Sequence, residues 1–306
     1  MKANQIDMAL RKSSWQEYLE LCKPRVVGLI VFTAIIGMFL ASPNFVPLSI
    51  LVPSTLGITL SAASAAAINH VAEYRIDALM SRTQHRPLPQ GGITRTNALI
   101  FALTVGLLGM GLLVFFVNLL TAVLTFFSLI GYAVIYTMYL KYATPQNIVI
   151  GGAAGAAPPV LGWASITGTV EPDALLLFLI IFAWTPPHFW ALAIYRREDY
   201  AKAAIPMLPV THGLTYTRTQ ILIYTLILVV TTLIPYAAYM AGEVYLVGII
   251  LLNAVFLTYV VRMQFNHSDL LAYKTFKFSI VYLGLLFLLL FLDHYQVKAK
   301  LVTLLN

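Results

Sequence analysis

Charged residues are scarce in this 306-residue chain: Asp, Glu, Lys and Arg make up 10% of it, against 60% hydrophobic residues. Soluble globular domains contain about 25% charged residues. The composition therefore excludes an ordinary soluble fold and indicates a polytopic membrane protein. The net charge of +7 is what cytoplasmic loops rich in Lys and Arg would give, so it carries no indication of nucleic-acid binding.

Cysteine is almost absent as well. Cys22 is the only one, which excludes an internal disulfide and a four-cysteine zinc site. The chain contains no HExxH, GxSxG or P-loop motif, so the metalloprotease, serine hydrolase and nucleotide-driven classes have no support. No secretory signal is expected ahead of the first apolar run. Residues 8–22 predict an amphipathic helix on the membrane surface, with a partly disordered tail as the alternative.

Long apolar runs are what the chain has in abundance. A membrane-spanning helix needs about 20 apolar residues. Nine candidate spans are found, at residues 26–42, 48–68, 97–117, 119–139, 148–166, 174–194, 219–239, 244–261 and 277–293. The sequence thus predicts an all-α fold of about nine transmembrane helices, as a single transmembrane domain over residues 1–306 whose residues 1–24 form a cytoplasmic segment. The fifth span is rich in Gly and Ala and is expected at the centre of the bundle.

The basic residues predict the orientation. All of the 19 Lys and Arg except Lys298 and Lys300 lie on one side of the predicted spans. The positive-inside rule places that side in the cytoplasm. Nine spans then leave the C-terminus outside.

A first polar patch ends the second span. Asn69, Glu73 and Asp77 are spaced i, i+4, i+8, so on a helix they share one face. Their oxygens form a ligand set that suits Mg²⁺. Acidic groups close to lipid are costly and tend to be functional, although a solvated helix end is the simpler alternative. Arg82 and Arg86 follow, and the guanidinium fork matches phosphate oxygens.

A second polar patch follows the sixth span. Asp199 is the candidate metal ligand, and Arg196 and Lys202 are candidate phosphate contacts. Lys141, after the fourth span, could supply a further cation. Asp77 is followed ten residues later by Pro87 and then Pro89, and Asp199 is followed by Pro206 and Pro209, which hints at two similar half-sites facing one cavity.

His188 follows two prolines near the cytoplasmic end of the sixth span. A histidine buried in a helix bundle could ligate a heme iron or hydrogen-bond a substrate carboxylate. A structural histidine beside a proline kink is the alternative.

Three stretches, at residues 69–89, 136–163 and 184–210, resemble the UbiA-type intramembrane prenyltransferases. The resemblance runs from about residue 24 to residue 293. Residues 188–209 narrow it to the branch that farnesylates heme. The resemblance implies a bundle around a central cavity, farnesyl diphosphate and heme B as substrates, Mg²⁺ as cofactor, and heme O and diphosphate as products. It also implies a place in the cell inner membrane and a possible handoff to a heme A synthase or terminal oxidase.

Carried over by position, the resemblance makes Asn69, Glu73 and Asp77 the first diphosphate–magnesium motif and Arg196, Asp199 and Lys202 the second. The catalytic residues it implies are Asn69, Glu73, Asp77 and Asp199, with the last three as metal ligands, and Arg196 and Lys202 bind the substrate. The chain departs from the family pattern in three places. Many members have Asp at the positions of Glu73 and Arg75, and a basic residue at that of Tyr142. These departures concern the metal geometry more than the reaction.

Three other readings remain open at this point. The first is a sister prenyltransferase with an aromatic acceptor from a quinone or chlorin pathway. The second is a membrane transporter, since intramembrane acid–base pairs also line ion paths, although the charges here gather at one membrane surface. The third is a heme-binding assembly factor without catalysis.

Overall fold

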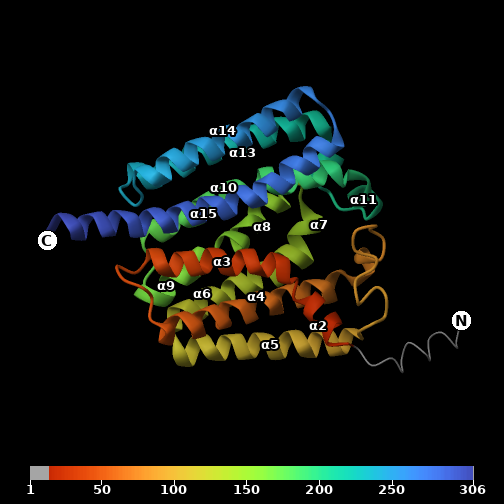
Figure 1. Cartoon of the computed structure of the whole chain (residues 1–306). Coiled ribbons are helices and arrows are strands. Elements are labelled where there is room, and N and C mark those ends of the chain that lie inside the picture. Colours follow the sequence, from red (N-terminus) through yellow and green to blue (C-terminus); the bar gives the residue numbers. More distant parts are fainter. Residues whose placement is uncertain (1–13, 306) are drawn as a thin grey trace, which may run out of the picture.

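The computed structural model describes residues 14–305, with side chains through Gln296, and every regular element in that range is a helix. The helices are α2 (Trp15–Leu21), α3 (Pro24–Leu40), α4 (Leu48–Asp77), α5 (Arg95–Phe116), α6 (Leu119–Ile130), the π-helix η1 (Gly131–Leu140), α7 (Lys141–Ala143), α8 (Asn147–Ala156), α9 (Pro158–Thr167), α10 (Pro172–Tyr195), α11 (Arg197–Lys202), α12 (Leu208–Thr211), α13 (Gly213–Ala237), α14 (Glu243–Phe265) and α15 (Asp269–Leu305). They form one bundle (Figure 1).

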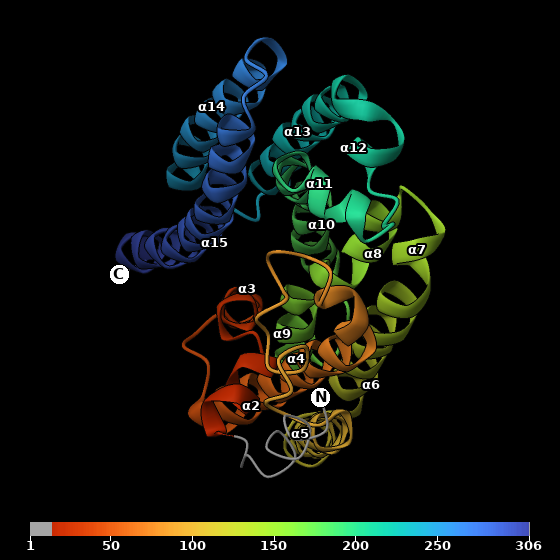
Figure 2. The ribbon, with the colours of Figure 1, turned by 90° about the vertical axis from the view of Figure 1, so that its right-hand side faces the viewer.

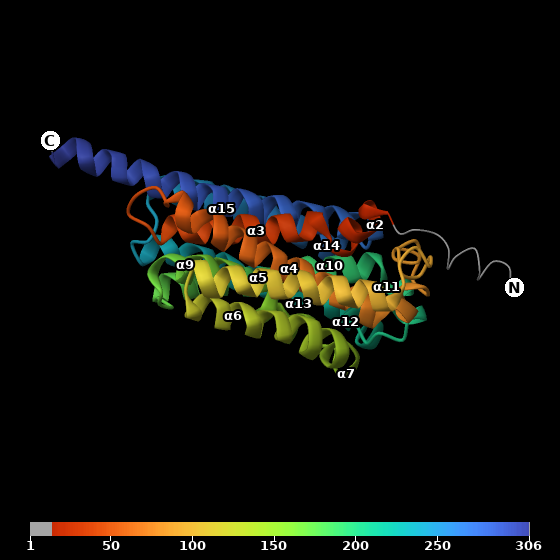
Figure 3. The same cartoon turned by 90° about the horizontal axis from the view of Figure 1, so that it is seen from below.

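Eight helical segments in the described part of the chain are long and apolar enough to cross a membrane. The pair α2 and α3, bent by 54°, makes up to nine. The predicted all-α, multi-pass membrane fold is therefore confirmed. In Figures 1 and 3, α2 and the C-terminal part of α15 lie at opposite ends of the bundle, as an odd number of crossings requires.

The break between α2 and α3 falls at Lys23, whose backbone is left-handed with φ 48°. Pro24 then opens α3, where its missing N–H costs nothing. Before the break, Ser14 and Glu17 form a capping box that starts α2. Trp15 is 71% exposed, as the predicted surface helix requires. Residues 8–13 of that prediction lie outside the described residues.

Several helix limits differ from the sequence prediction. The helix α4 runs to Asp77 rather than to residue 68, so the first polar patch forms its last turns. The fifth span is divided between α8 and α9 because Pro158 cannot donate a helical hydrogen bond. The helices α13 and α15 begin at Gly213 and Asp269, six and eight residues earlier than predicted, because polar residues continue the helices beyond their apolar parts.

The packing centres on α10. It contacts α8, α9, α13 and α15, and Figure 2, which looks along the bundle, shows it between these helices. The Gly/Ala-rich fifth span is 61% buried over its most apolar window, as much as α10 and more than any other span. The chain segments that carry the polar patches, α7, α11 and residues 78–94, lie together at the end of the bundle where α2 begins (Figure 1).

Candidate active site

The polar face of α4 is buried at the C-terminal end of the helix. Asn69, Glu73 and Asp77 are exposed by only 3%, 4% and 3%, as their i, i+4, i+8 spacing on one face allows. Two carboxylates in this place lose hydration and meet the negative end of the helix dipole. Both effects are unfavourable for the charged form, so cations from other elements are needed to hold it.

Two cations meet these carboxylates directly. Lys141, at the start of α7, places Nζ 2.6 Å from Glu73 Oε1. Arg86, in the segment of residues 78–94, places a guanidinium nitrogen 2.7 Å from Asp77 Oδ2. The structure thus brings both predicted cations to the first patch.

A third cation at this patch is one that the sequence analysis counted only toward topology. Lys23 Nζ donates to Asn69 Oδ1 at 2.5 Å, and Asn69 Nδ2 donates to Thr137 at 3.1 Å. Burial, followed by the neighbouring charge of Arg86, lowers the pKa of Lys23 to about 7. No carboxylate pairs with Lys23 among residues 14–296. A cation held among other cations is suited to bind an anion.

The π-helix η1 positions the far side of this patch. Thr137 Oγ1 donates to Tyr132 O at 2.8 Å, across the five-residue step of a π-helix. Such wide turns are rare and occur often at functional sites. Here η1 carries Thr137 against Asn69 and leads directly into Lys141.

The second patch is joined to the first through a serine. Asp199, in α11, is 8% exposed. The Ser81 hydroxyl lies 2.9 and 2.8 Å from the two Asp199 carboxylate oxygens, and Arg196 lies 3.6 Å away. Ser81 belongs to the segment that also carries Arg86, and that segment is tied to α4 where Thr83 donates to the Asp77 carbonyl oxygen. The two patches therefore form one connected site.

Three predicted residues are not part of these contacts. Arg82 and Lys202 are exposed and form no ion pair or hydrogen bond with a residue of the described side chains, so their phosphate contacts stay predictions. Arg197, which lies between the predicted residues Arg196 and Asp199, pairs with Asp269 at 2.9 Å. His188 lies on α10 and contacts Ser279 of α15. No simple sequence pattern pointed to Ser81 or Thr137, because each acts through a partner distant in the chain.

The donor set suits Mg²⁺ together with a phosphate ligand. Among residues 14–296, no three His, Cys, Asp or Glu side chains lie close enough to hold a metal by themselves. Mg²⁺ usually takes one or two carboxylates and completes its shell with water and phosphate. Glu73 and Asp77 each use one carboxylate oxygen in their ion pairs, and the other oxygen forms no hydrogen bond or ion pair with the described side chains.

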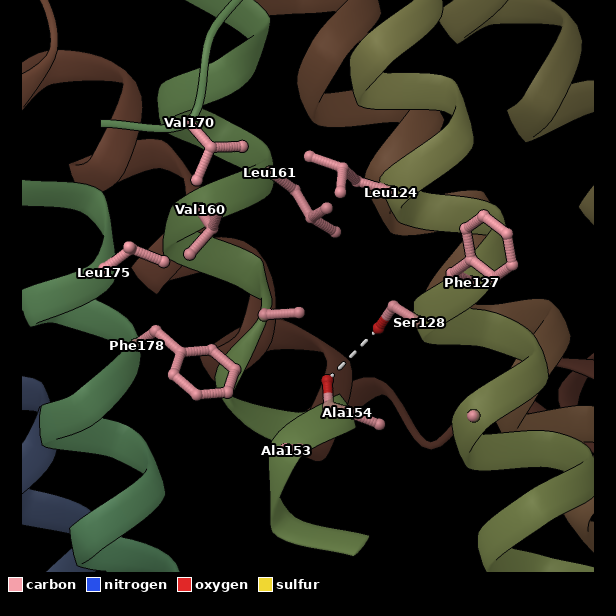
Figure 4. A pocket seen from close by; sticks show the side chains of 12 residues that line it. Leu124, Phe127, Ser128, Ala153, Ala154, Val160, Leu161, Val170, Leu175 and Phe178 are labelled. Atoms are coloured by element: carbon pink, nitrogen blue, oxygen red, sulfur yellow. Dashed lines mark hydrogen bonds between the residues drawn. The ribbon is translucent and has the colours of Figure 1, made fainter. Parts of the chain in front are cut away.

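A separate cavity of about 400 Å³ lies among apolar side chains of α6, α8, α9 and α10 (Figure 4). Ser128 is its one hydroxyl, and it donates to the Ala154 carbonyl oxygen at 3.2 Å. None of the carboxylates lines it. The central cavity over the polar patches therefore stays a prediction.

The UbiA prenyltransferase family model matches residues 30–294. The chain belongs to this family. As a UbiA prenyltransferase it is 58% identical over 284 residues to a protein of Methylococcus capsulatus named protoheme IX farnesyltransferase, covering 93% of this chain and 95% of the relative. A Nitrosococcus oceani protein of the same name is 57% identical, covering 94% and 96%. Family membership makes the chain a prenyltransferase enzyme and leaves the transporter and assembly-factor alternatives unsupported.

Solved structures agree on the fold of this UbiA prenyltransferase. A digeranylgeranylglyceryl phosphate synthase matches with a TM-score of 0.77 at 19% identity, covering 92% of this chain and 98% of that one. A UbiA homolog from Archaeoglobus fulgidus, bound to GPP and Mg²⁺, matches with a TM-score of 0.63 at 19% identity, covering 90% and 99%.

Proposed function

We propose that this prenyltransferase moves the farnesyl group of farnesyl diphosphate to a vinyl group of heme B, with addition of water, giving heme O and diphosphate. The observation that carries the proposal is the identity of 54–58%, over at least 92% of the chain, to relatives named protoheme IX farnesyltransferase. These names favour heme over an aromatic acceptor.

The site supports the diphosphate part of this reaction. Asn69, Glu73, Asp77 and Asp199 would hold Mg²⁺, which when bound neutralises charge on the diphosphate. Lys141 and Arg86 would each move a charged nitrogen from a carboxylate to a diphosphate oxygen as metal and substrate enter. Fixed positive charge aimed at a developing anion is often the largest catalytic contribution. The bond between the farnesyl carbon and the diphosphate oxygen breaks, the heme vinyl group supplies the electron pair of the new carbon–carbon bond, and water adds to the cation left beside the porphyrin with loss of a proton. The apolar surroundings keep water from capturing the farnesyl carbon first.

The cellular setting belongs to the same proposal. The patches lie at the membrane end that carries most Lys and Arg, so we place them at the cytoplasmic face of the cell inner membrane. A heme A synthase or terminal oxidase would take up the product, since heme O with its farnesyl tail stays in the bilayer.

The test is incubation of the purified protein with heme B, farnesyl diphosphate and Mg²⁺, read by chromatography and mass spectrometry. We expect a heme product carrying a hydroxyethylfarnesyl group, and none after chelation of the metal. Asp77→Asn and Asp199→Asn should each lower turnover by about 100-fold or more. Glu198→Gln, an exposed neighbour on α11, is the matched control and should keep wild-type turnover. Wild-type turnover in both Asp variants would contradict the site assignment.

A further inference from the structure

His188 sits in an aromatic cage that leaves only the edge of its ring available. The side chain is 8% exposed. Its ring stacks on Trp184 with centroids 4.1 Å apart and interplanar angle 19°, and Phe276 lies 4.7 Å away at 33°. Phe189 meets the ring edge-on at 5.0 Å. A ligand can therefore approach His188 through its nitrogens rather than through its faces.

The hydrogen bonds around Ser279 favour one tautomer of the His188 ring. A serine hydroxyl has one proton to donate. Ser279 donates it to the Phe276 carbonyl oxygen at 2.7 Å. Ser279 Oγ is also 2.7 Å from His188 Nδ1, so in that contact the oxygen accepts and Nδ1–H donates. A neutral imidazole carries one N–H, so Nε2 holds a free electron pair.

Other contacts hold this arrangement in place. Trp184 Nε1 donates to the Ser279 carbonyl oxygen at 2.8 Å. Two hydrogen bonds, from Trp184 and from His188, therefore join α10 to Ser279 of α15. His188 Nε2 has no hydrogen-bond partner among the described side chains, yet it is not one of the fully buried polar atoms that lack a partner. Both ring nitrogens of His70, by contrast, are fully buried and have no hydrogen-bond partner there. His188 Nε2 is thus an electron-pair donor that no described side chain occupies.

The place of His188 suits the acceptor substrate. It lies seven residues before the end of α10, about 10 Å along the helix at 1.5 Å per residue. Beyond that end come Arg196 and Asp199 of the diphosphate site. A porphyrin carries its vinyl groups at its rim, so its iron can lie at His188 while a vinyl group points toward the departing diphosphate.

We propose that His188 binds the iron of heme B through Nε2, with Ser279 as the positioning residue that keeps Nδ1 protonated. The inference rests on the proposed function, because it takes heme B as the acceptor. The tautomer decides between two roles for His188. A hydrogen bond to a heme propionate needs an N–H at Nε2, whereas an iron bond needs the free electron pair found there. Metal-binding histidines commonly donate their other N–H to a protein acceptor in this way.

The test compares heme B with metal-free protoporphyrin IX, which has the same propionate and vinyl groups but no iron. Affinities are measured by absorbance titration of the full-length purified protein. His188→Ala should weaken heme B binding by about tenfold or more, change its Soret band, and leave protoporphyrin binding unchanged. His212→Ala is the matched control, an exposed histidine whose ring also stacks on an aromatic side chain, Tyr216. It should change neither affinity.

Two further replacements separate the roles of the ring. His188→Met supplies an electron pair without an N–H and should keep an iron-bound spectrum, shifted from that of wild type. His188→Gln keeps hydrogen-bond donors and should lose the iron-bound spectrum. Ser279→Ala should weaken heme B binding several-fold, with protoporphyrin binding again unchanged, because both neutral tautomers of the ring then become available.

The outcomes separate this inference from the proposed function. Equal weakening of both porphyrins in His188→Ala, or an unchanged Soret band while heme B is still farnesylated, overturns the iron bond and leaves the function standing. A folded wild-type protein that binds neither porphyrin and forms no product overturns the function and this inference with it.

Discussion

Single side chains at the polar end of α4 show how a charged site is kept inside a membrane protein. Glu73 and Asp77 are buried at the unfavourable end of a helix, and Lys141 and Arg86 compensate them one to one. Lys23 forms no ion pair with a described carboxylate and instead donates a hydrogen bond that orients Asn69. The helical spacing of Asn69, Glu73 and Asp77 could be predicted from the sequence. The partnership of Lys23 with Asn69 could not, because it joins residues 46 positions apart.

Replacement of Lys23 by Met should weaken the binding of the prenyl diphosphate. The variant loses a cation and the charge-assisted hydrogen bond to Asn69, an interaction worth about 1.5–3 kcal/mol. Because each 1.4 kcal/mol is a factor of ten, we expect the KM for farnesyl diphosphate to rise by about 10–100-fold. Steady-state kinetics at saturating heme B measures it. Arg25→Met, an exposed cation two residues away, is the control. Equal KM values in both variants would contradict the role of Lys23.

At the scale of helices, close packing depends on small residues. The composition indicated that such residues are present, but not where the helices would cross. The glycines Gly37 of α3 and Gly162 of α9 lie where the two helices cross. A Cβ on Gly162 would overlap the Ala34 carbonyl oxygen, and one on Gly37 would overlap that of Pro159. The Gly/Ala-rich run predicted a central span, and the structure shows which of its glycines touch backbone.

Gly162→Ala should destabilise the bundle, because the new methyl meets backbone atoms that cannot turn away. Overpacking of this kind costs about 1–3 kcal/mol. The measurement is the thermal midpoint of the detergent-solubilised protein. Gly155→Ala on the neighbouring helix α8 is the control, since a Cβ there meets nothing within 4 Å. Similar midpoints for both variants would show that the crossing can open at little cost.

The helix α14 is capped at its N-terminus by a side chain from α15. The N-terminus of α14 has no side-chain cap of its own. Asp293 of α15, 1% exposed, accepts from the backbone N–H groups of Gly242 and Tyr245 at 2.5 and 3.1 Å. The sequence offers no sign of this, because the two helices meet only in the fold.

Asp293→Ala should leave two backbone N–H groups without a partner, at a cost of about 1–3 kcal/mol each. We expect a lower thermal midpoint and an unchanged kcat in the protein that remains folded. Asp293 accepts from backbone N–H groups at the start of α14, and that start lies at the end of the bundle opposite α7 and α11 (Figure 1). Glu243→Gln, exposed beside the same helix start, should have little effect. A large loss of kcat at full stability would contradict a purely structural role.

At the scale of the whole molecule, the charge distribution and the path of the chain agree on the orientation of the bundle in the membrane. The segments α7, α11 and residues 78–94 lie at one end of the bundle (Figure 1), and they hold five of the 19 Lys and Arg together with parts of both polar patches. The loop between α9 and α10 lies at the other end (Figure 1).

The orientation can be tested by cysteine labelling, because replacing Cys22 alone gives a background without cysteine. In a Cys22→Ser background, we expect Thr169→Cys to react with a membrane-impermeant maleimide in spheroplasts, because residue 169 would face outward. His85→Cys should react only after the membrane is permeabilised. Both positions are exposed in the protein, so accessibility from solvent is not limiting. The reverse pattern would invert the proposed topology.

The sequence by itself determined the membrane class, the helical fold, the approximate spans and the face that Asn69, Glu73 and Asp77 share, because hydropathy and helical periodicity are local properties of the chain. Only the tertiary structure decided that Lys23 and Lys141 meet that face, that Ser81 joins it to Asp199, and that Ser279 leaves His188 Nε2 with a free electron pair. These contacts join residues 46 to 118 positions apart. Local patterns do not specify them, since each depends on how the helices pack.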